Sequence, residues 1–346
     1  MREDEEPDRS EKNILISPEN KKYMSKQIYI TRNIPEAGLK LLREKGIDFD
    51  IGTSKNPPTK KEIIKALKKK HYDGIISFLT DSLDQDVFEA CPTVKVCANF
   101  SVGFDNVDID EVKKRNICVS NTPGTSAVAV AEHAVALMLT LTTRIDEGDR
   151  FMRSGKFKGW DPNLLIGTDL RGKTVGLIGA GQIGTEVAKI LHYGFGVKII
   201  YSDIAPNLEL EKISGPTRKE TCEILREADI ISLHVPLLPS TKHLINKQSL
   251  ATMKKTAFLI NTSRGAVIDE KALVSALKKG IIRGAGIDVY EFEPKLTSGL
   301  TKLSNIVLTP HIASARQSAR DMMAEIAAKN IISALETGKV INSIIK

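Results

Sequence analysis

Residues 175–184 read V-G-L-I-G-A-G-Q-I-G, and they decide the fold. The apolar run before Gly179 is typical of a buried strand, and the residues after Gly184, T-E-V-A-K-I-L, have helical spacing. In a strand–turn–helix unit Gly179 permits a tight turn, Gly181 lets the backbone approach a pyrophosphate, and Gly184 lets helix and strand pack closely. The helix N-terminus then offers free N–H groups to phosphates. The segment predicts a dinucleotide-binding unit.

Asp203 narrows the choice of dinucleotide. It ends a second apolar strand, I-I-Y-S-D, 19 positions after Gly184. A carboxylate there can accept hydrogen bonds from the adenosine ribose hydroxyls, and it repels a 2′-phosphate. Residues 204–206 are I-A-P and carry no positive charge. We therefore expect NAD(H) rather than NADP(H), and we expect removal of Asp203 not to repair NADPH binding fully. The alternatives are a polar strand end and a glycine-rich turn that binds nothing.

Composition excludes several classes of protein. The 346 residues are enough for two domains, and 41% hydrophobic with 27% charged residues is typical of a globular chain. The net charge of +7 does not indicate a nucleic-acid partner, because the densest basic stretch, 65–70, lies on an amphipathic helix with a solvated face. No apolar run approaches the ~20 residues of a membrane helix. The four cysteines have no metal-binding spacing, so we expect a reducing compartment, the cytoplasm, and no metal.

The chain divides into a charged N-terminal segment and two alternating series of strands and helices. Residues 1–23 are expected to be a disordered extension. The first series has strands at 28–31, 49–51, 74–79, 94–98 and 117–120, with helices such as 37–45 and 60–70 between them. A long helix is expected over 127–151. The second series starts at Thr174, with strands at 230–235, 257–261, 285–288 and 306–308, and a last helix is expected at 315–337. The alternation predicts an α/β fold with two doubly wound parallel-sheet, Rossmann-like domains and a cleft between them.

Reactive side chains gather at strand ends of the second series, where ligands collect in open α/β sheets. Hydride transfer to a 2-keto acid requires a proton donor, a fixed cation for the substrate carboxylate, and a carboxylate that supports the donor. His311, Arg264 and Glu293 fit those roles, because Arg264 can grip a carboxylate as a fork and Glu293 would stabilise an imidazolium. His133 lies in an apolar helix and is expected to be a core or interface residue. His234 ends a strand without a supporting acid.

The sequence resembles the D-isomer-specific 2-hydroxyacid dehydrogenases from about residue 27 to the C-terminus. The motifs that carry the resemblance are N-F-S-V-G-F-D-N-V-D (99–108), N-T-P-G-T-S (121–126), A-E-H-A-V-A-L-M-L (131–139), L-H-V-P-L (233–237), N-T-S-R-G (261–265), G-I-D-V-Y-E-F-E-P (286–294) and L-T-P-H-I-A-S (308–314). The resemblance implies a discontinuous substrate domain, 24–122 plus 314–346. An NAD-binding domain with a dimerisation helix, 123–313, would lie between the two parts.

The resemblance also implies a set of site residues. The catalytic residues would be Arg264, Glu293 and His311. Residues that bind the cofactor would be Gly179, Gly181, Gln182, Ile183, Gly184, Asp203, Val235, Pro236, Thr262, Ser263, Arg264, Asp288 and His311, with Asp288 on the nicotinamide carboxamide. Residues that bind the substrate would be Leu79, Val102, Gly103, Arg264 and His311, with backbone N–H groups at 101–103 on the substrate carboxylate.

Within that family the motifs are most similar to glyoxylate/hydroxypyruvate reductases. L-T-D (79–81), S-V-G-F-D (101–105) and G-W-D-P-N-L-L-I-G-T-D-L (159–170) carry this resemblance, and Trp160 would reach the active site of the partner in a homodimer. Asn99 stands where phosphoglycerate dehydrogenases have an arginine. A phosphoglycerate or other D-2-hydroxyacid dehydrogenase stays an alternative. An NAD(H)-sensing transcriptional corepressor-like protein is an alternative of another class, because such corepressors retain the same Arg, Glu and His.

Overall fold

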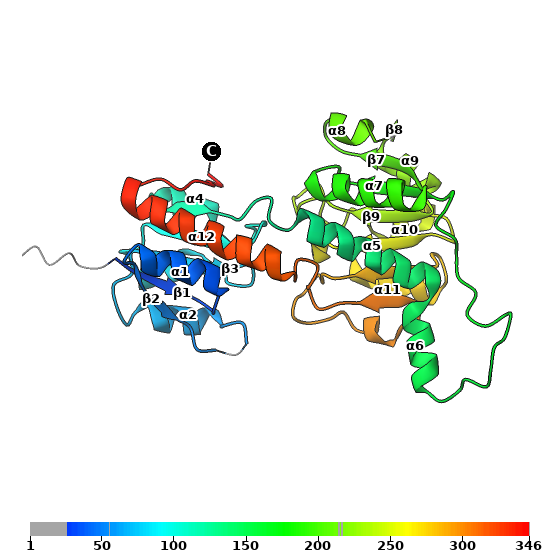
Figure 1. Ribbon diagram of the computed structural model, residues 1–346, viewed down its shortest axis with the longest axis horizontal. Coiled ribbons are helices and arrows are strands. Elements are labelled where there is room, and N and C mark those ends of the chain that lie inside the picture. Colours follow the sequence, from blue (N-terminus) through cyan, green and yellow to red (C-terminus); the bar gives the residue numbers. More distant parts are fainter. Residues whose placement is uncertain (1–25, 55, 214, 216, 346) are drawn as a thin grey trace, which may run out of the picture.

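The computed structural model describes residues 26–54, 56–213, 215 and 217–345 as an α/β protein with two parallel sheets (Figure 1). The predicted disordered segment 1–23 lies outside these residues. The first sheet has the order β2-β1-β3-β4-β5. Its strands are β1 (Gln27–Ile30), β2 (Asp48–Ile51), β3 (Gly74–Phe78), β4 (Val96–Phe100) and β5 (Cys118–Ser120). The connecting helices are α1 (Glu36–Glu44), α2 (Lys60–Leu67), α3 (Gln85–Ala90) and α4 (Ile109–Lys114).

The second sheet has the order β12-β11-β10-β9-β6-β7-β8, and its strands pair in parallel. They are β6 (Thr174–Ile178), β7 (Lys198–Ser202), β8 (Thr217–Arg218), β9 (Ile230–Leu233), β10 (Phe258–Asn261), β11 (Gly284–Ile287) and β12 (Ile306–Leu308). Its helices are α7 (Gln182–Phe195), α8 (Leu208–Glu211), α9 (Thr221–Glu227), α10 (Lys247–Thr252) and α11 (Glu270–Lys278), with short 3-10 turns at Gly265–Val267 and Leu300–Lys302. The predicted fold class is confirmed, and the order of strands reverses between β6 and β9.

Each sheet is buried on both faces, as parallel sheets require. Successive residues of one strand enter opposite cores: Ile230 packs with the cluster that contains α5 (Ala127–Thr143) and α7, and Ile231 packs with the cluster on the other face. The helix α12 (Gln317–Thr337) returns to the first sheet, where Met323 and Ile331 share a core with Ile28. Figure 1 shows α12 running from the junction of the two halves across the first sheet.

One predicted helix is wrong. The helix expected over 127–151 is two helices, α5 and α6 (Ile145–Arg153), which are bent by 61° about Arg144, whose φ is 59°. The break has a physical cause. The backbone N–H of Thr168 donates to the carbonyl of Thr142 (2.7 Å), a carbonyl that would otherwise accept from the next turn of a continuing helix. The apolar pattern continues through the break, so the pattern alone could not reveal it.

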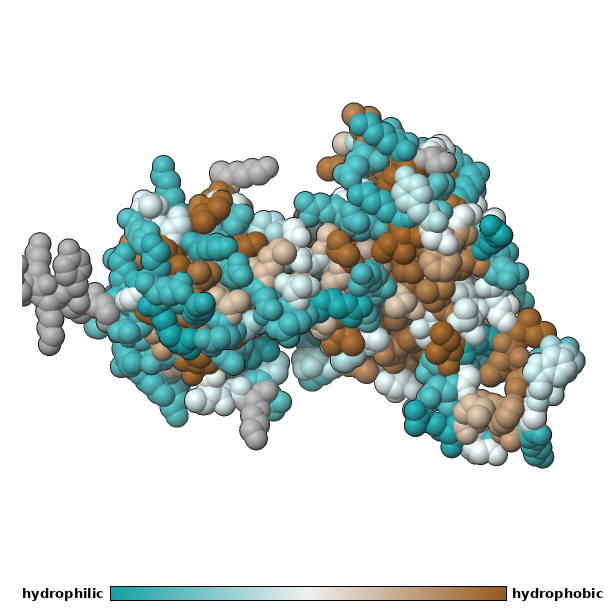
Figure 2. All heavy atoms as spheres, viewed as in Figure 1, coloured by the Kyte–Doolittle hydropathy of each residue, from teal (hydrophilic) through white to brown (hydrophobic). Residues whose placement is uncertain are grey.

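Among the described residues, no single helix is long and apolar enough to cross a membrane, although α5 and α6 together reach that length and hydropathy. Eight of the 17 residues of α5 are buried within the protein. In the view of Figure 2, hydrophobic residues gather over the region of α5 and α7 and along the loop that follows α6. That loop exposes Phe157, Trp160 and Ile166, with Trp160 86% exposed.

Candidate active site at the carboxyl edge of the second sheet

The glycine turn after β6 has an open side and a closed side. Gly179 has φ 98°, and a Cβ on it would lie 2.6 Å from the carbonyl carbon of His234. A Cβ on Gly184 would collide with the carbonyl of Gly179. A Cβ on Gly181, in contrast, would meet nothing within 4 Å, and no side chain caps the N-terminus of α7 there. Close packing therefore explains why Gly179 and Gly184 have no side chain. At Gly181 the backbone stays accessible to a phosphate.

Asp203 is fastened to this turn. One carboxylate oxygen accepts the N–H of Ala180 (2.6 Å), and the other accepts the N–H of Ile204 (2.7 Å). The negative charge is therefore held beside the glycine turn, at the end of the strand next to β6. The structure also brings Arg218 of β8 against the backbone of Asp203 (2.9 Å), a positive charge that the order of the sequence did not reveal.

His234 packs against the buried side of the glycine turn. It is followed by Val235 and Pro236 at the end of β9, and its ring is close to the position of a Cβ on Gly184. Burial lowers the pKa of His234 to about 4, and neither ring nitrogen has a hydrogen-bond partner within the described part of the chain. A neutral, buried imidazole cannot donate a proton to a substrate at neutral pH, so His234 is a poor candidate for the acid.

His311 and Glu293 form the pair that the sequence suggested. The Nδ1 atom of His311 lies 2.9 Å from Oε2 of Glu293, and the other carboxylate oxygen accepts the N–H of Tyr290 (2.9 Å). About a quarter of each side chain is exposed, 27% for His311 and 29% for Glu293. Over the described residues, Nε2 of His311 has no partner. The carboxylate thus fixes one ring nitrogen and leaves the other available for a substrate oxygen.

Asp288 anchors the loop that carries His311. Its side chain is fully buried and accepts the hydroxyl of Thr309 (2.6 Å) and the N–H groups of Ile312 (2.9 Å) and Ala313 (2.8 Å). Burial raises the pKa of Asp288, but the hydrogen bonds outweigh burial, and the pKa is lowered overall. The expected contact of Asp288 with the nicotinamide carboxamide stays a prediction, since the carboxylate is enclosed by its own loop.

His133 belongs to the same network, which sequence reasoning missed. It projects from α5 with Nε2 3.0 Å from the hydroxyl of Thr309 and 3.5 Å from the carboxylate of Asp288. The apolar surroundings of His133 in the sequence predicted a core or interface residue. The missing information was the spatial proximity of α5 to the end of β12.

Arg264 joins the two sheets. Its Nε donates to Asp105 of the first half of the chain (3.0 Å), and its Nη1 donates to the carbonyl of Ser263 (2.9 Å). The preceding turn is held by Asn261, whose amide donates to the carbonyl of Arg264 (2.9 Å) and accepts the N–H of Ser263 (3.0 Å). A Cβ on Gly103 would overlap the Arg264 guanidinium. The arginine therefore lies directly against the predicted substrate loop.

The loop 101–103 presents free backbone donors. The carbonyl of Gly103 is turned inward, where it accepts the amide of Asn99 (2.8 Å) and the hydroxyl of Ser101. The N–H groups of Val102 and Gly103 have no acceptor among the residues that the structure describes. Leu79 directly follows β3, the neighbour of β4 in the first sheet, and is partly buried. Two free N–H groups beside a guanidinium form a suitable site for a carboxylate.

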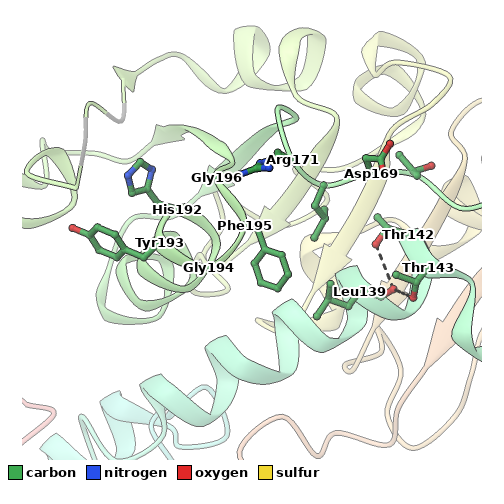
Figure 3. A pocket seen from close by; sticks show the side chains of 12 residues that line it. Leu139, Thr142, Thr143, Asp169, Arg171, His192, Tyr193, Gly194, Phe195 and Gly196 are labelled. Atoms are coloured by element: carbon green, nitrogen blue, oxygen red, sulfur yellow. Dashed lines mark hydrogen bonds between the residues drawn. The ribbon is translucent and has the colours of Figure 1, made fainter.

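The predicted cofactor and catalytic residues follow six neighbouring strands at one edge of the second sheet. Gly179 follows β6, Asp203 follows β7, and Val235 follows β9, while Thr262 to Arg264, Asp288 and His311 follow β10, β11 and β12. A separate hollow of about 530 Å³, shown in Figure 3, is lined by residues such as Thr142, Arg171 and Tyr193 and contains none of the predicted site residues. Ligands of open parallel sheets bind at the carboxyl edge near the reversal of strand order, as this arrangement requires.

These features together define a dinucleotide-dependent dehydrogenase: a parallel sheet with this glycine turn, an acid at the end of the next strand, and a histidine–carboxylate pair. The model of the D-isomer specific 2-hydroxyacid dehydrogenase NAD-binding domain matches residues 135–313, which is more than half of the chain. The chain belongs to the D-isomer specific 2-hydroxyacid dehydrogenases. The predicted family, the enzyme class and the NAD cofactor are thereby confirmed.

Individual relatives agree with this assignment. A glyoxylate reductase of Thermofilum pendens is 47% identical over 314 residues, which cover 90% of this chain and 91% of the relative. A crystal structure of a protein from Thermus thermophilus superimposes with a TM-score of 0.85 at 38% identity, covering 92% of this chain and 100% of that one. An NADPH-dependent glyoxylate/hydroxypyruvate reductase from Sinorhizobium meliloti has a TM-score of 0.79 at 30% identity, with 92% and 97% covered.

Proposed function

We propose that the protein reduces glyoxylate to glycolate, or hydroxypyruvate to D-glycerate, with NADH. The observation that carries the proposal is the His311–Glu293 pair at the same sheet edge as Arg264, which contacts the substrate loop of the other sheet. The similarity to glyoxylate reductases supports the substrate class.

Each residue would have a separate role. NADH, when bound, would supply the hydride to the keto carbon. Arg264 and the free N–H groups of Val102 and Gly103 would hold the substrate carboxylate. His311, charged and oriented by Glu293, would donate the proton from Nε2 as negative charge develops on the carbonyl oxygen. In the reverse direction neutral His311 would take that proton back.

The glycine turn and Asp203 would hold the adenosine half of the cofactor. The open side of Gly181 and the uncapped start of α7 fit the pyrophosphate, and the fixed carboxylate of Asp203 fits ribose hydroxyls. These features support a preference for NADH over NADPH. They agree with an NAD-binding domain over residues 135–313.

We further propose a homodimer in the cytoplasm. The loop after α6 exposes a run of apolar side chains, Phe157, Trp160, Leu164 and Ile166. Such a run on a projecting loop is typical of an interface rather than of a monomer surface. Light scattering after gel filtration measures the mass directly, and a monomer at micromolar concentration would contradict the proposal.

A substrate panel tests the proposed activity. Glyoxylate, hydroxypyruvate, phosphohydroxypyruvate and pyruvate should be offered with NADH and with NADPH, and kcat/KM compared. We expect glyoxylate or hydroxypyruvate with NADH to give the highest value. A clear preference for phosphohydroxypyruvate would favour the phosphoglycerate dehydrogenase alternative. Tight NADH binding without turnover of any 2-keto acid would favour the corepressor-like alternative.

A further inference from the structure

Arg218 lies beside Asp203 in the fold, although the two residues are distant in sequence. It lies on the edge strand β8, where it is paired in register with Tyr201 of β7, two residues before Asp203. Its guanidinium donates from Nε and Nη2 to the carbonyl of Asp203 (3.2 and 2.9 Å) and from Nη2 to the carbonyl of Ile204 (3.3 Å). A residue 15 positions away in sequence is therefore held against the end of β7.

The charge of Arg218 is not neutralised by an acid. Among the described residues, its polar contacts are backbone carbonyls, no carboxylate pairs with it, and its Nη1 atom has no acceptor. The side chain is exposed at the rim of the sheet. A guanidinium with free N–H groups is well suited to bind a phosphate as a fork.

Asp203 and Arg218 present opposite charges at the end of one strand. Asp203 cannot turn away easily, because its two oxygens are bound by the N–H groups of Ala180 and Ile204 (2.6 and 2.7 Å). In the proposed function this carboxylate receives the ribose hydroxyls, so a 2′-phosphate would approach the same strand end. There the phosphate would be repelled by the carboxylate and attracted by the guanidinium.

We propose that Arg218 is one half of an adenosine 2′-phosphate subsite whose use Asp203 restricts. The chain would then need a single substitution to accept NADPH well. The sequence led us to expect that removal of Asp203 would not repair NADPH binding fully, because residues 204–206 carry no positive charge, whereas the position of Arg218 gives a reason to expect a fuller repair. The inference relies on the proposed function only in placing the adenosine ribose at Asp203.

The test is a double-mutant cycle of Asp203 and Arg218 in which cofactor affinity is measured. NAD⁺ and NADP⁺ are titrated calorimetrically into the wild type, Asp203→Ala, Arg218→Ala and the double variant, and kcat/KM for glyoxylate is measured with NADH and NADPH. Asp203→Ala should tighten NADP⁺ binding at least about tenfold, the scale of one charge-assisted contact. Adding Arg218→Ala should abolish that gain, while Arg218→Ala alone should leave NAD⁺ binding within about twofold.

Two further variants make the result specific. Lys198→Ala removes a positive charge at the opposite end of β7 and should change neither affinity. Arg218→Gln keeps a donor for the two carbonyls but loses the charge, so it should behave like Arg218→Ala toward NADP⁺ with an unchanged melting temperature.

The outcomes separate the two proposals. If Asp203→Ala gains NADP⁺ affinity equally with and without Arg218, the subsite is wrong even though the enzyme works. If the wild type binds NAD⁺ but reduces no 2-keto acid, the proposed function fails while the binding cycle can still be read. If Asp203→Ala gains no NADP⁺ affinity, the inference is also overturned.

Discussion

Replacing Glu293 by glutamine should lower kcat/KM for the reduction of glyoxylate. Reduction requires His311 to carry a proton, and the carboxylate of Glu293 stabilises that charged form from 2.9 Å away. The glutamine removes the charge but retains a hydrogen-bonding oxygen for the ring. The charged ring that donates the proton should therefore be less well stabilised, and kcat/KM in the reduction direction should fall.

The separation of the two groups sets the magnitude. Two unit charges 2.9 Å apart interact by about 1.4 kcal/mol at the dielectric constant of water and by about 6 kcal/mol at an effective value near 20. Since about 1.4 kcal/mol corresponds to a factor of ten in rate, these limits correspond to losses of about 10-fold and about 10⁴-fold in kcat/KM. Because more than a quarter of each side chain is exposed, we expect a loss near the lower limit, about 10-fold to 100-fold.

The assay is kcat/KM for glyoxylate with NADH at neutral pH. Glu291→Gln is the matched control, because Glu291 lies two residues away and binds His243 instead (2.7 Å), so its replacement should leave kcat/KM unchanged. A Glu293→Gln enzyme that keeps the wild-type kcat/KM would refute the reasoning. The carboxylate would then only position the ring, and its charge would not matter to the proton.

Three other substitutions test the rest of the site. His311→Ala should lower kcat by roughly 10²–10⁴-fold while the Kd for NADH, measured by fluorescence titration, changes little. Arg264→Ala should raise KM for the keto acid as well as lower kcat, and a variant with an unchanged KM would remove Arg264 from the substrate carboxylate. Asp288→Asn should lower the melting temperature at pH 7. The pKa of Asp288 is lowered from its ordinary value of 3.8, so the carboxylate stabilises the fold at pH values above 3.8, and this stabilisation is lost as the pH falls further. Below about pH 4 the wild type should therefore lose more stability than the variant, which has no carboxylate to protonate.

The parts that the sequence predicted correctly depend on neighbouring residues. The turn after β6 combines one strand, three glycines and one helix within 22 residues of sequence, from Thr174 to Phe195, so its geometry is encoded locally. The alternation of strands and helices likewise predicted two parallel sheets, although β4 begins at Val96 instead of residue 94 and β8 was not expected. Local patterns encode elements and turns because their hydrogen bonds close over short separations.

The parts that could not be predicted join distant segments. Arg264 and Asp105 are separated by 159 positions, and His133 and Thr309 by 176, so no spacing in the sequence indicates either contact. The break at Arg144 has the same origin, since it is fixed by the chain at Thr168. In each case the decisive partner belongs to a different element, and only the packed fold brings the two together.

This distinction explains why the cofactor class was easier to predict than the substrate. The groups proposed to hold a 2-keto acid, the guanidinium of Arg264 and the N–H groups of Val102 and Gly103, address the carboxylate that all such substrates share. Discrimination depends on what surrounds the remaining substituent, for which the sequence offered Leu79 and, in a dimer, Trp160 of the second subunit. Glyoxylate and hydroxypyruvate differ only in a hydroxymethyl group, so a side chain that contacts this group should affect one substrate more than the other. A Trp160→Ala variant should therefore change the ratio of kcat/KM for the two substrates. An unaltered ratio would place the tryptophan outside the substrate site.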